Sequence, residues 1–181
     1  YPKPSTLRII QDKRLQKQFY QRNLIPTSAF YCYESKSELL KGGMTFPCVQ
    51  KAAKEGYDGR GVSILRSQAD LEALPDGPGI IEEFITDIRE ISVIVARRPN
   101  GQMIAYPSVE MEFHPTANLV EFLFSPSTLS REMEAEAKEI AFRVAEGLEL
   151  VGILAVEMFV TPTGKILVNE SAPRPHNSGH H

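Results

Sequence analysis

Residues 152–171, GILAVEMFVTPTGKILVNES, contain two runs of strand-forming residues on either side of the segment TPTG. β-Branched and aromatic residues are typical of strands, and Pro and Gly between two such runs are typical of a hairpin turn. We therefore expect residues 152–161 and 165–171 to pair as an antiparallel hairpin. This hairpin is expected to belong to the main sheet of the protein.

The region before this hairpin continues the strand pattern. Further strands are expected over residues 79–84, 90–98, 102–113 and 118–124. The dipeptide Asn100-Gly101 after Pro99 predicts a tight turn between the second and third of them. Ser130 is expected to cap the longest helix, which reaches about residue 148 and has an apolar face at helical spacing. That apolar face indicates a core position and no chemistry.

The N-terminal part alternates short helices and strands. Asp12 is expected to cap a helix that runs to Arg22, with Leu15 and Phe19 on one face. Strands are expected over residues 28–33, 46–53 and 62–65, and short helices over residues 37–41 and 69–74. The predicted fold class is α+β, with a small front lobe (residues 1–75) and a larger lobe (residues 76–181) built on an antiparallel sheet with packed helices.

The composition limits the possible functions. Hydrophobic residues make up 42% of the 181 residues and charged residues 24%, the balance of a soluble globular protein. The formal net charge of −3 argues against nucleic acid as a partner, and no apolar run approaches the roughly 20 residues of a membrane span. Cys32 and Cys48 lack metal-site spacing and indicate reduced thiols, so a cytoplasmic protein is expected. Because the chain opens on Tyr1, we expect it to be a segment of a longer protein.

The predicted hairpin carries a pair of carboxylates. If Thr161 pairs with Gly164 across a two-residue turn, Glu157 and Glu170 become diagonal neighbours on one face of the sheet. Two carboxylates roughly 6 Å apart repel by about 3 kcal/mol at an effective dielectric constant near 20. Such a pair requires a cation, and Mg²⁺ is typically held by one or two carboxylates and substrate phosphates, with Asn169 close by. Alternatively, both glutamates face solvent, and a three-residue loop ending in Gly164 would change the register.

Residues 54–61, KEGYDGRG, form a glycine-rich loop after a strand that carries Lys51. Glycines let the backbone approach a ligand closely and present amides to phosphate oxygens, and Lys51 would complement phosphate charge. The loop matches neither the P-loop nor the Rossmann fingerprint, and a flexible hairpin loop is the alternative interpretation. The acidic stretch of residues 82–90 follows a strand that could line the same cleft, but solvated glutamates explain it equally well.

These segments occur together and in this order in one known family. The lysine on a strand, GYDGRG, EEF with a following glutamate, AVEMFV and LVNESAPRPHNSGH resemble the ATP-grasp carboxylate–amine ligases. Within that family the resemblance is to the ligases of purine biosynthesis that carboxylate aminoimidazole ribonucleotide with bicarbonate. It covers nearly the whole chain, from QDKRLQKQF at residues 11–19 onward. The resemblance implies an ATP-grasp core without the family's N-terminal Rossmann-like domain and C-terminal piece, which would be inactive alone.

The resemblance also implies an activity and the molecules that bind. Such ligases use ATP and Mg²⁺ to convert bicarbonate into carboxyphosphate, and then transfer the carboxyl group to the exocyclic amine of the ribonucleotide. The full-length protein is expected to be a homodimer. Residues implied to bind the ATP phosphates are Lys13, Lys51, Gly56, Tyr57, Gly59, Arg60 and Gly61. Those implied to hold the adenine are Glu82, Glu83, Phe84 and Ile85, and Glu90 is implied to hold the ribose.

The remaining implied roles concern the metal and the reacting molecules. Glu157 and Glu170 are implied to hold Mg²⁺, with Asn169 beside the nucleotide. The residues implied to face bicarbonate and the ribonucleotide are Asp58, Arg174, His176, Asn177 and Ser178. Two alternatives remain open. A formate-using glycinamide ribonucleotide transformylase also carries an RPH element, but typically with an acidic residue and threonine in place of Asn177-Ser178. A non-catalytic nucleotide-binding module is disfavoured by the intact carboxylate pair and the lysine.

Overall fold

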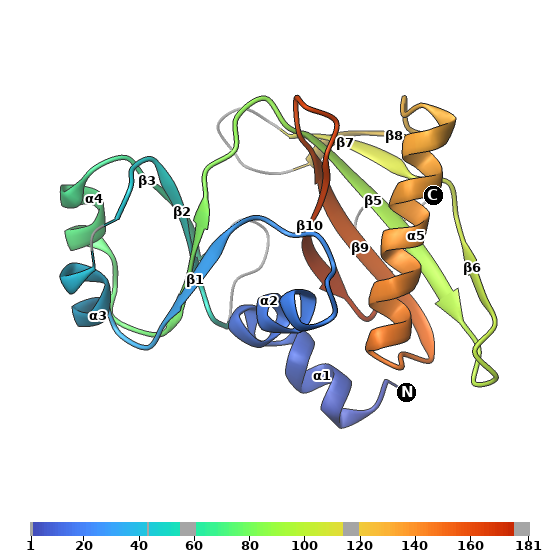
Figure 1. Cartoon of the computed structure of the whole chain (residues 1–181), viewed down its shortest axis with the longest axis horizontal. Coiled ribbons are helices and arrows are strands. Elements are labelled where there is room, and N and C mark those ends of the chain that lie inside the picture. The colour runs from blue at the N-terminus through green and yellow to red at the C-terminus, as the bar shows by residue number, and fades with distance from the viewer. Residues whose placement is uncertain (1, 43, 55–60, 114–119, 176–181) are drawn as a thin grey trace.

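A computed structural model describes residues 2–42, 44–54, 61–113 and 120–175 of the protein. The chain forms two antiparallel sheets of unequal size, which lie on either side of the second N-terminal helix (Figure 1). The predicted α+β class is therefore confirmed. Within the described residues, no helix is both long enough and apolar enough to cross a membrane.

The smaller sheet has the strand order β1-β4-β2-β3. Its strands are β1 (Phe30–Tyr33), β2 (Cys48–Ala52), β3 (Val62–Leu65) and β4 (Gly79–Glu83). The helices α3 (Lys36–Lys41) and α4 (Gln68–Ala73) pack beside it around a small core that includes Leu39, Leu65 and Leu71. Ser67 and Asp70 form a capping box at the start of α4, as expected from Ser67 in the sequence.

The larger sheet has the order β10-β9-β5-β7-β8, and β6 also pairs with β5. Its strands are β5 (Arg89–Arg97), β6 (Met103–Ala105), β7 (Val109–Phe113), β8 (Val120–Phe124), β9 (Gly152–Val160) and β10 (Ile166–Ala172). The single strand predicted over residues 102–113 is wrong, because β6 and β7 pair with different parts of β5. Pro107 lies between them and cannot donate a ladder hydrogen bond.

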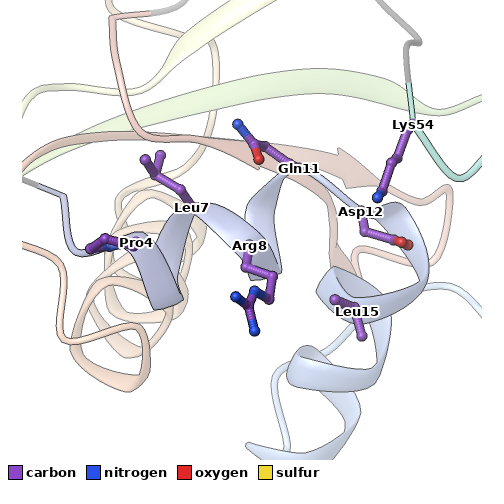
Figure 2. A pocket seen from close by; sticks show the side chains of 7 residues that line it. All are labelled: Pro4, Leu7, Arg8, Gln11, Asp12, Leu15 and Lys54. Atoms are coloured by element: carbon purple, nitrogen blue, oxygen red, sulfur yellow. The ribbon is translucent and has the colours of Figure 1, made fainter.

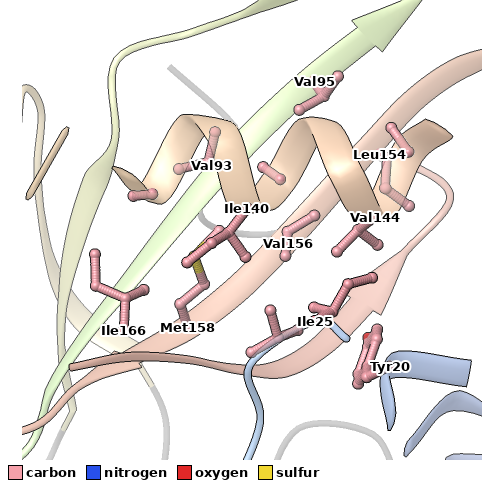
Figure 3. Packing of buried hydrophobic residues seen from close by; sticks show 14 of the residues in the cluster. Tyr20, Ile25, Val93, Val95, Ile140, Val144, Leu154, Val156, Met158 and Ile166 are labelled. Atoms are coloured by element: carbon pink, nitrogen blue, oxygen red, sulfur yellow. The ribbon is translucent and has the colours of Figure 1, made fainter. Parts of the chain in front are cut away.

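The helix α5 (Arg131–Gly147) covers one face of the larger sheet. Ser130 caps it as predicted, with its hydroxyl accepting a hydrogen bond from the amide of Met133. Its apolar face, with Ile140 and Val144, packs on alternate residues of β5 and β9 (Figure 3). Because alternate residues of a strand point to opposite faces, the other face of these strands is left for polar side chains.

Two helices, α1 (Pro4–Ile10) and α2 (Lys13–Arg22), begin the chain. α2 lies between the sheets, and α1 packs against the larger lobe, where the hydroxyl of Thr6 donates to the carbonyl of Leu148. No sequence pattern predicted α1. The expected apolar face of α2 is wrong in part: Phe19 is buried but Leu15 is 36% exposed. The buried face instead contains Gln16, Lys17 and Tyr20. Polar side chains can be buried there because each is hydrogen-bonded to β10, the last strand of the larger sheet.

The division between the lobes differs from the predicted boundary at residue 75. β4 pairs with β1 and β2, so the chain leaves the smaller sheet only after Glu83. In addition, Phe19 and Tyr20 of α2 join the core of the larger sheet. The polypeptide therefore crosses between the two sheets more than once, and the site lies where these crossings meet.

Gly79 marks a close approach between β4 and its neighbours. A Cβ atom at this position would lie 2.5 Å from the carbonyl oxygen of Lys51 and 2.5 Å from the hydroxyl of Tyr33. We expect Gly79→Ala to lower the free energy of unfolding by about 1–3 kcal/mol, because the backbone of Lys51 must move. Urea denaturation provides the measurement. Gly42→Ala is the control, since its nearest neighbour would be 3.6 Å away, and equal effects of the two changes would contradict the packing argument.

Candidate functional site

The hairpin of β9 and β10 brings Glu157 and Glu170 opposite each other. The predicted two-residue turn is wrong, because the backbone amide of Thr161 donates to the carbonyl of Lys165 and the loop between them holds three residues. Gly164 in this loop has a φ of 82°, a conformation that favours glycine. The predicted diagonal arrangement of the two glutamates is therefore also wrong.

A β-bulge sets the register at the end of this hairpin. Val168 pairs with Met158, but Glu170, two residues later, pairs with Glu157, the next residue on β9. The extra residue is Asn169. In a regular strand without the bulge, residue 170 would share the face of Val168, which is buried against α5. The bulge therefore places both glutamates on the face of the sheet that α5 does not cover.

A third carboxylate, Glu90, lies on the same face. β5 pairs with β9 so that Ser92 is opposite Glu157 and Glu90 is opposite Phe159. Burial and the negative charge of Glu157 raise the pKa of Glu90 to about 7, against the opposing effect of the Lys51 ammonium. A cation placed here would lower this pKa, because it would stabilise the ionised carboxylate.

Lysines from α2 and β2 face these carboxylates. The Nζ atom of Lys13 lies 2.9 Å from Oε2 of Glu170, and the backbone amide of Lys13 donates to the carbonyl of Ala53 at the end of β2. The Nζ atom of Lys51 donates to Oδ1 of Asn169 at 2.6 Å and lies 6.0 Å from the ring centre of Phe159. The two predicted phosphate lysines are thus brought to the carboxylate pair from different elements.

A buried ionic cluster supports Lys51 from behind. Oε2 of Glu82 is 2.5 Å from Nζ of Lys51, and Oε1 of Glu82 is paired with Nζ of Lys17. The hydroxyl of Ser28 donates to Oε1 of Glu82 at 3.0 Å. Burial would raise the pKa of Glu82, but the ammonium groups of Lys51 and Lys17 outweigh it and lower this pKa to about 2. The carboxylate of Glu82 is thus held ionised by protein partners.

Lys17 and Ser28 were not predicted as site residues. A signal for Lys17 was present, since Lys13, Gln16, Lys17 and Tyr20 follow the spacing of one helix face. A polar stripe of this kind on a short amphipathic helix is usually solvated, and only the position of α2 between the sheets makes it part of the site. Ser28 had no comparable signal.

The oxygen-rich face fits a hard cation. Among the described residues, no group of three or more histidine, cysteine or acidic side chains could hold a metal by itself. Mg²⁺ does not require such a group, because it commonly uses one or two carboxylates and takes its other ligands from phosphates and water. The Glu157–Glu170 pair provides that number of carboxylates.

Several predicted site residues are placed away from this face or lie outside the described residues. Arg174 is exposed, and its guanidinium donates to the carbonyl of Pro175 at 3.3 Å. Glu83 is exposed, with its amide donating to Ala29, and Phe84 and Ile85 are half-buried after β4. Gly61 has a φ of 76° and accepts a hydrogen bond from Ala52. The predicted residues outside the described ranges are Gly56, Tyr57, Asp58, Gly59, Arg60, His176, Asn177 and Ser178.

A cavity of about 410 Å³ lies beside α1, the start of α2 and Lys54 (Figure 2). Its lining consists of Pro4, Leu7, Arg8, Gln11, Asp12, Leu15 and Lys54. The carboxylate of Asp12 in this cavity accepts hydrogen bonds on both of its oxygens from the guanidinium of Arg14. The cavity contains none of the three carboxylates described above, so it is separate from the candidate site.

Two unequal antiparallel sheets, with lysines and a carboxylate pair meeting between them, define the class of this protein. The family model of the ATP-grasp domain matches residues 18–181, and the chain belongs to the ATP-grasp family. It is similar to phosphoribosylaminoimidazole carboxylase of Saccharomyces cerevisiae, with 36% identity over 189 residues that cover 100% of this chain and 33% of the yeast protein.

Solved structures give the same class. N5-carboxyaminoimidazole ribonucleotide synthetase from Thermotoga maritima is similar with 42% identity and a TM-score of 0.84, over 99% of this chain and 46% of that one. N5-carboxyaminoimidazole synthase from Aspergillus clavatus, in complex with ADP and 5-aminoimidazole ribonucleotide, is similar with 28% identity and a TM-score of 0.84, over 99% and 48%. The predicted ATP-grasp core is confirmed. The chain spans less than half the length of these relatives.

The raised pKa of Glu90 makes stability depend on pH. Its ordinary pKa is 4.5 and its pKa in the folded protein is about 7. Between these values the folded state binds more protons than the unfolded state, so this carboxyl stabilises the fold at low pH and the contribution is lost as the pH rises. In metal-free buffer, Glu90→Gln should be more stable than the wild type at pH 8, and this advantage should shrink towards pH 4.5. Urea midpoints at both pH values test this, and an advantage that is equal at both would contradict it.

Proposed function

We propose that this chain is the nucleotide-binding part of an ATP-dependent ligase that carboxylates aminoimidazole ribonucleotide. The observation that carries the proposal is the meeting of Lys13 and Lys51 with the Glu157–Glu170 pair across the β10 bulge. Such a site has positive groups for phosphate oxygens and a carboxylate pair for the cation that accompanies ATP. Charge neutralisation and positioning are the main requirements for transfer of a phosphoryl group.

Lys13 and Lys51 bind the phosphates in this proposal. Their ammonium groups approach from α2 and β2, so a phosphate chain between them would be contacted from both sides. Glu157 and Glu170 would hold Mg²⁺, which when bound neutralises phosphate charge and polarises the transferred group. Asn169 keeps Lys51 next to this pair through its side-chain oxygen. The glycine-rich loop with Gly56, Tyr57, Gly59, Arg60 and Gly61 is proposed to cover the phosphates.

The nucleoside is proposed to lie against the segment that connects the two sheets. Glu82, Glu83, Phe84 and Ile85 form this segment, and Phe84 and Ile85 offer half-buried apolar side chains to an adenine ring. The carboxylate of Glu82 is already paired with two lysines, so its contribution would come from its backbone. Glu90, near the start of β5, would accept hydrogen bonds from the ribose hydroxyls once its carboxyl group is ionised.

The proposed reaction is the carboxylation that the similar enzymes are named for. The Aspergillus clavatus structure contains ADP and 5-aminoimidazole ribonucleotide, and the yeast relative is a phosphoribosylaminoimidazole carboxylase. Bicarbonate would attack the γ-phosphorus of ATP to form carboxyphosphate and ADP, and the substrate amine would then attack the carboxyl carbon and release phosphate. Asp58, Arg174, His176, Asn177 and Ser178 are proposed to face bicarbonate and the ribonucleotide. Arg174 suits this role because a guanidinium can bind two anionic oxygens at once.

Binding of ATP to the 181-residue chain is the first test. We expect calorimetric titration to show binding that is stronger with Mg²⁺ than without it, and Lys51→Met to weaken the binding of MgATP at least tenfold. Lys41→Met is a matched control, because it removes the same charge from an exposed position on α3. Binding that is unchanged by Lys51→Met would contradict the proposed phosphate site, and binding that does not depend on Mg²⁺ would contradict the metal site.

The carboxylate pair is tested by Glu170→Gln in the full-length protein. We expect turnover to be lost, because one of two metal-binding carboxylates becomes neutral. The fold should remain, since Glu170 is partly exposed and its ion pair with Lys13 contributes little to stability. Glu139→Gln on the exposed face of α5 is the control and should retain activity. Steady-state assays with thermal unfolding give both quantities, and turnover at the wild-type rate in Glu170→Gln would contradict the assignment.

A further inference from the structure

Three charged side chains meet in the interior between the two sheets. Lys17 of α2, Lys51 of β2 and Glu82 of β4 are 2%, 7% and 3% exposed. Each ammonium group is paired with a different oxygen of the Glu82 carboxylate. Burial lowers the pKa of Lys17 to about 8, so its ammonium group is charged at pH 7. At that pH two positive charges and one negative charge leave this cluster with a net charge of +1.

The two lysines have different surroundings. The Nζ atom of Lys17 is within hydrogen-bond distance of Thr27 Oγ1 (2.6 Å), Ser28 Oγ (3.1 Å) and the carbonyl of Val168 (3.4 Å), in addition to Glu82. An ammonium group has three N–H donors, so these protein acceptors account for all of them. Lys17 therefore has no donor left for a ligand.

Lys51 lies on the ligand side of the cluster. Within the part of the chain that the structure describes, the ammonium group of Lys51 has two acceptors, Glu82 and Asn169. Because an ammonium group has three N–H donors, one donor is left for a ligand. Lys51 also lies near the ring of Phe159, on the face that carries Glu90 and Glu157. Of the two buried lysines, Lys51 is thus the one that can reach a phosphate.

We propose that Lys17 is a positioning residue for the phosphates of the nucleotide, acting through Glu82 on Lys51. The inference rests on the proposed function, in which Lys51 contacts these phosphates. Lys17 offsets the charge of Glu82, so that the charge of Lys51 remains available to the ligand. It also fixes the orientation of the carboxylate by binding one oxygen and leaving the other for Lys51. The same ammonium group also donates to the carbonyl of Val168, the residue directly before the bulge at Asn169.

The charge count suggests an experiment with three forms of the 181-residue chain. The cluster has a net charge of +1 in the wild type, 0 in Lys17→Met, and +1 again in the double variant Lys17→Met/Glu82→Gln. We expect Lys17→Met to weaken the binding of MgATP roughly tenfold or more, and the double variant to recover most of this loss. Adenosine has no phosphate, so its affinity should be the same in the wild type and in Lys17→Met. Lys41→Met is the control for removal of a remote positive charge.

Calorimetric titrations with MgATP and with adenosine separate the possible outcomes. Equal MgATP affinity in the wild type and Lys17→Met would overturn the inference but leave the proposed function intact. Equal losses for MgATP and adenosine would also overturn it, because they would indicate a structural role only. If Lys17→Met does not fold, the double variant Lys17→Met/Glu82→Gln provides the test. An MgATP affinity of the double variant ten times weaker than that of the wild type would contradict the charge argument. A wild type that binds no MgATP would overturn the proposed function, and the inference with it.

Discussion

The position of Glu170 depends on one extra residue in β10. Strict alternation along this strand would send residue 170 to the same side as Ile166 and Val168, which are buried against α5. The bulge at Asn169 reverses the alternation, so Glu170 faces Glu157 while Ser171 returns to the interior and hydrogen-bonds Tyr20. The part of the hairpin near the turn therefore supplies apolar side chains to the core, and the part beyond the bulge supplies both carboxylates to the site.

The buried ionic cluster fits the proposed binding of phosphate better than a role in stability. Removing charged groups from water costs several kcal/mol per ion, and apolar residues of similar size are often as stabilising in such positions. Here the cost is reduced because Ser28, Thr27 and Asn169 supply hydrogen bonds to the charged groups. The cluster also joins α2, β2, β4 and β10, so the lysines and the carboxylate pair have fixed positions relative to one another. A phosphate site requires that kind of rigidity, because small displacements weaken electrostatic stabilisation.

Much of the fold could be predicted from local patterns. The caps at Asp12, Ser67 and Ser130, the turn at Asn100-Gly101 and the strands on both sides of residues 162–164 all occur where they were expected. The predictions failed where two local arrangements compete. A two-residue and a three-residue hairpin loop fit the same four residues, and the choice between them shifts every pair along the strands. The strand over residues 79–83 had a clear pattern, but nothing in that pattern indicates which of two sheets it joins.

The sequence by itself determined the helices other than α1, most of the strands, and the residue types that suit phosphate and a hard cation. It could do so because caps, turns and side-chain periodicity act over a few neighbouring residues. Only the tertiary structure decided the face of Glu170, the sheet of β4 and the place of Lys17 in the site. Lys17 and Val168 are 151 residues apart along the chain, and their contact exists only because α2 lies between the two sheets. Such contacts depend on how elements pack, and packing is set by all of the buried surfaces together.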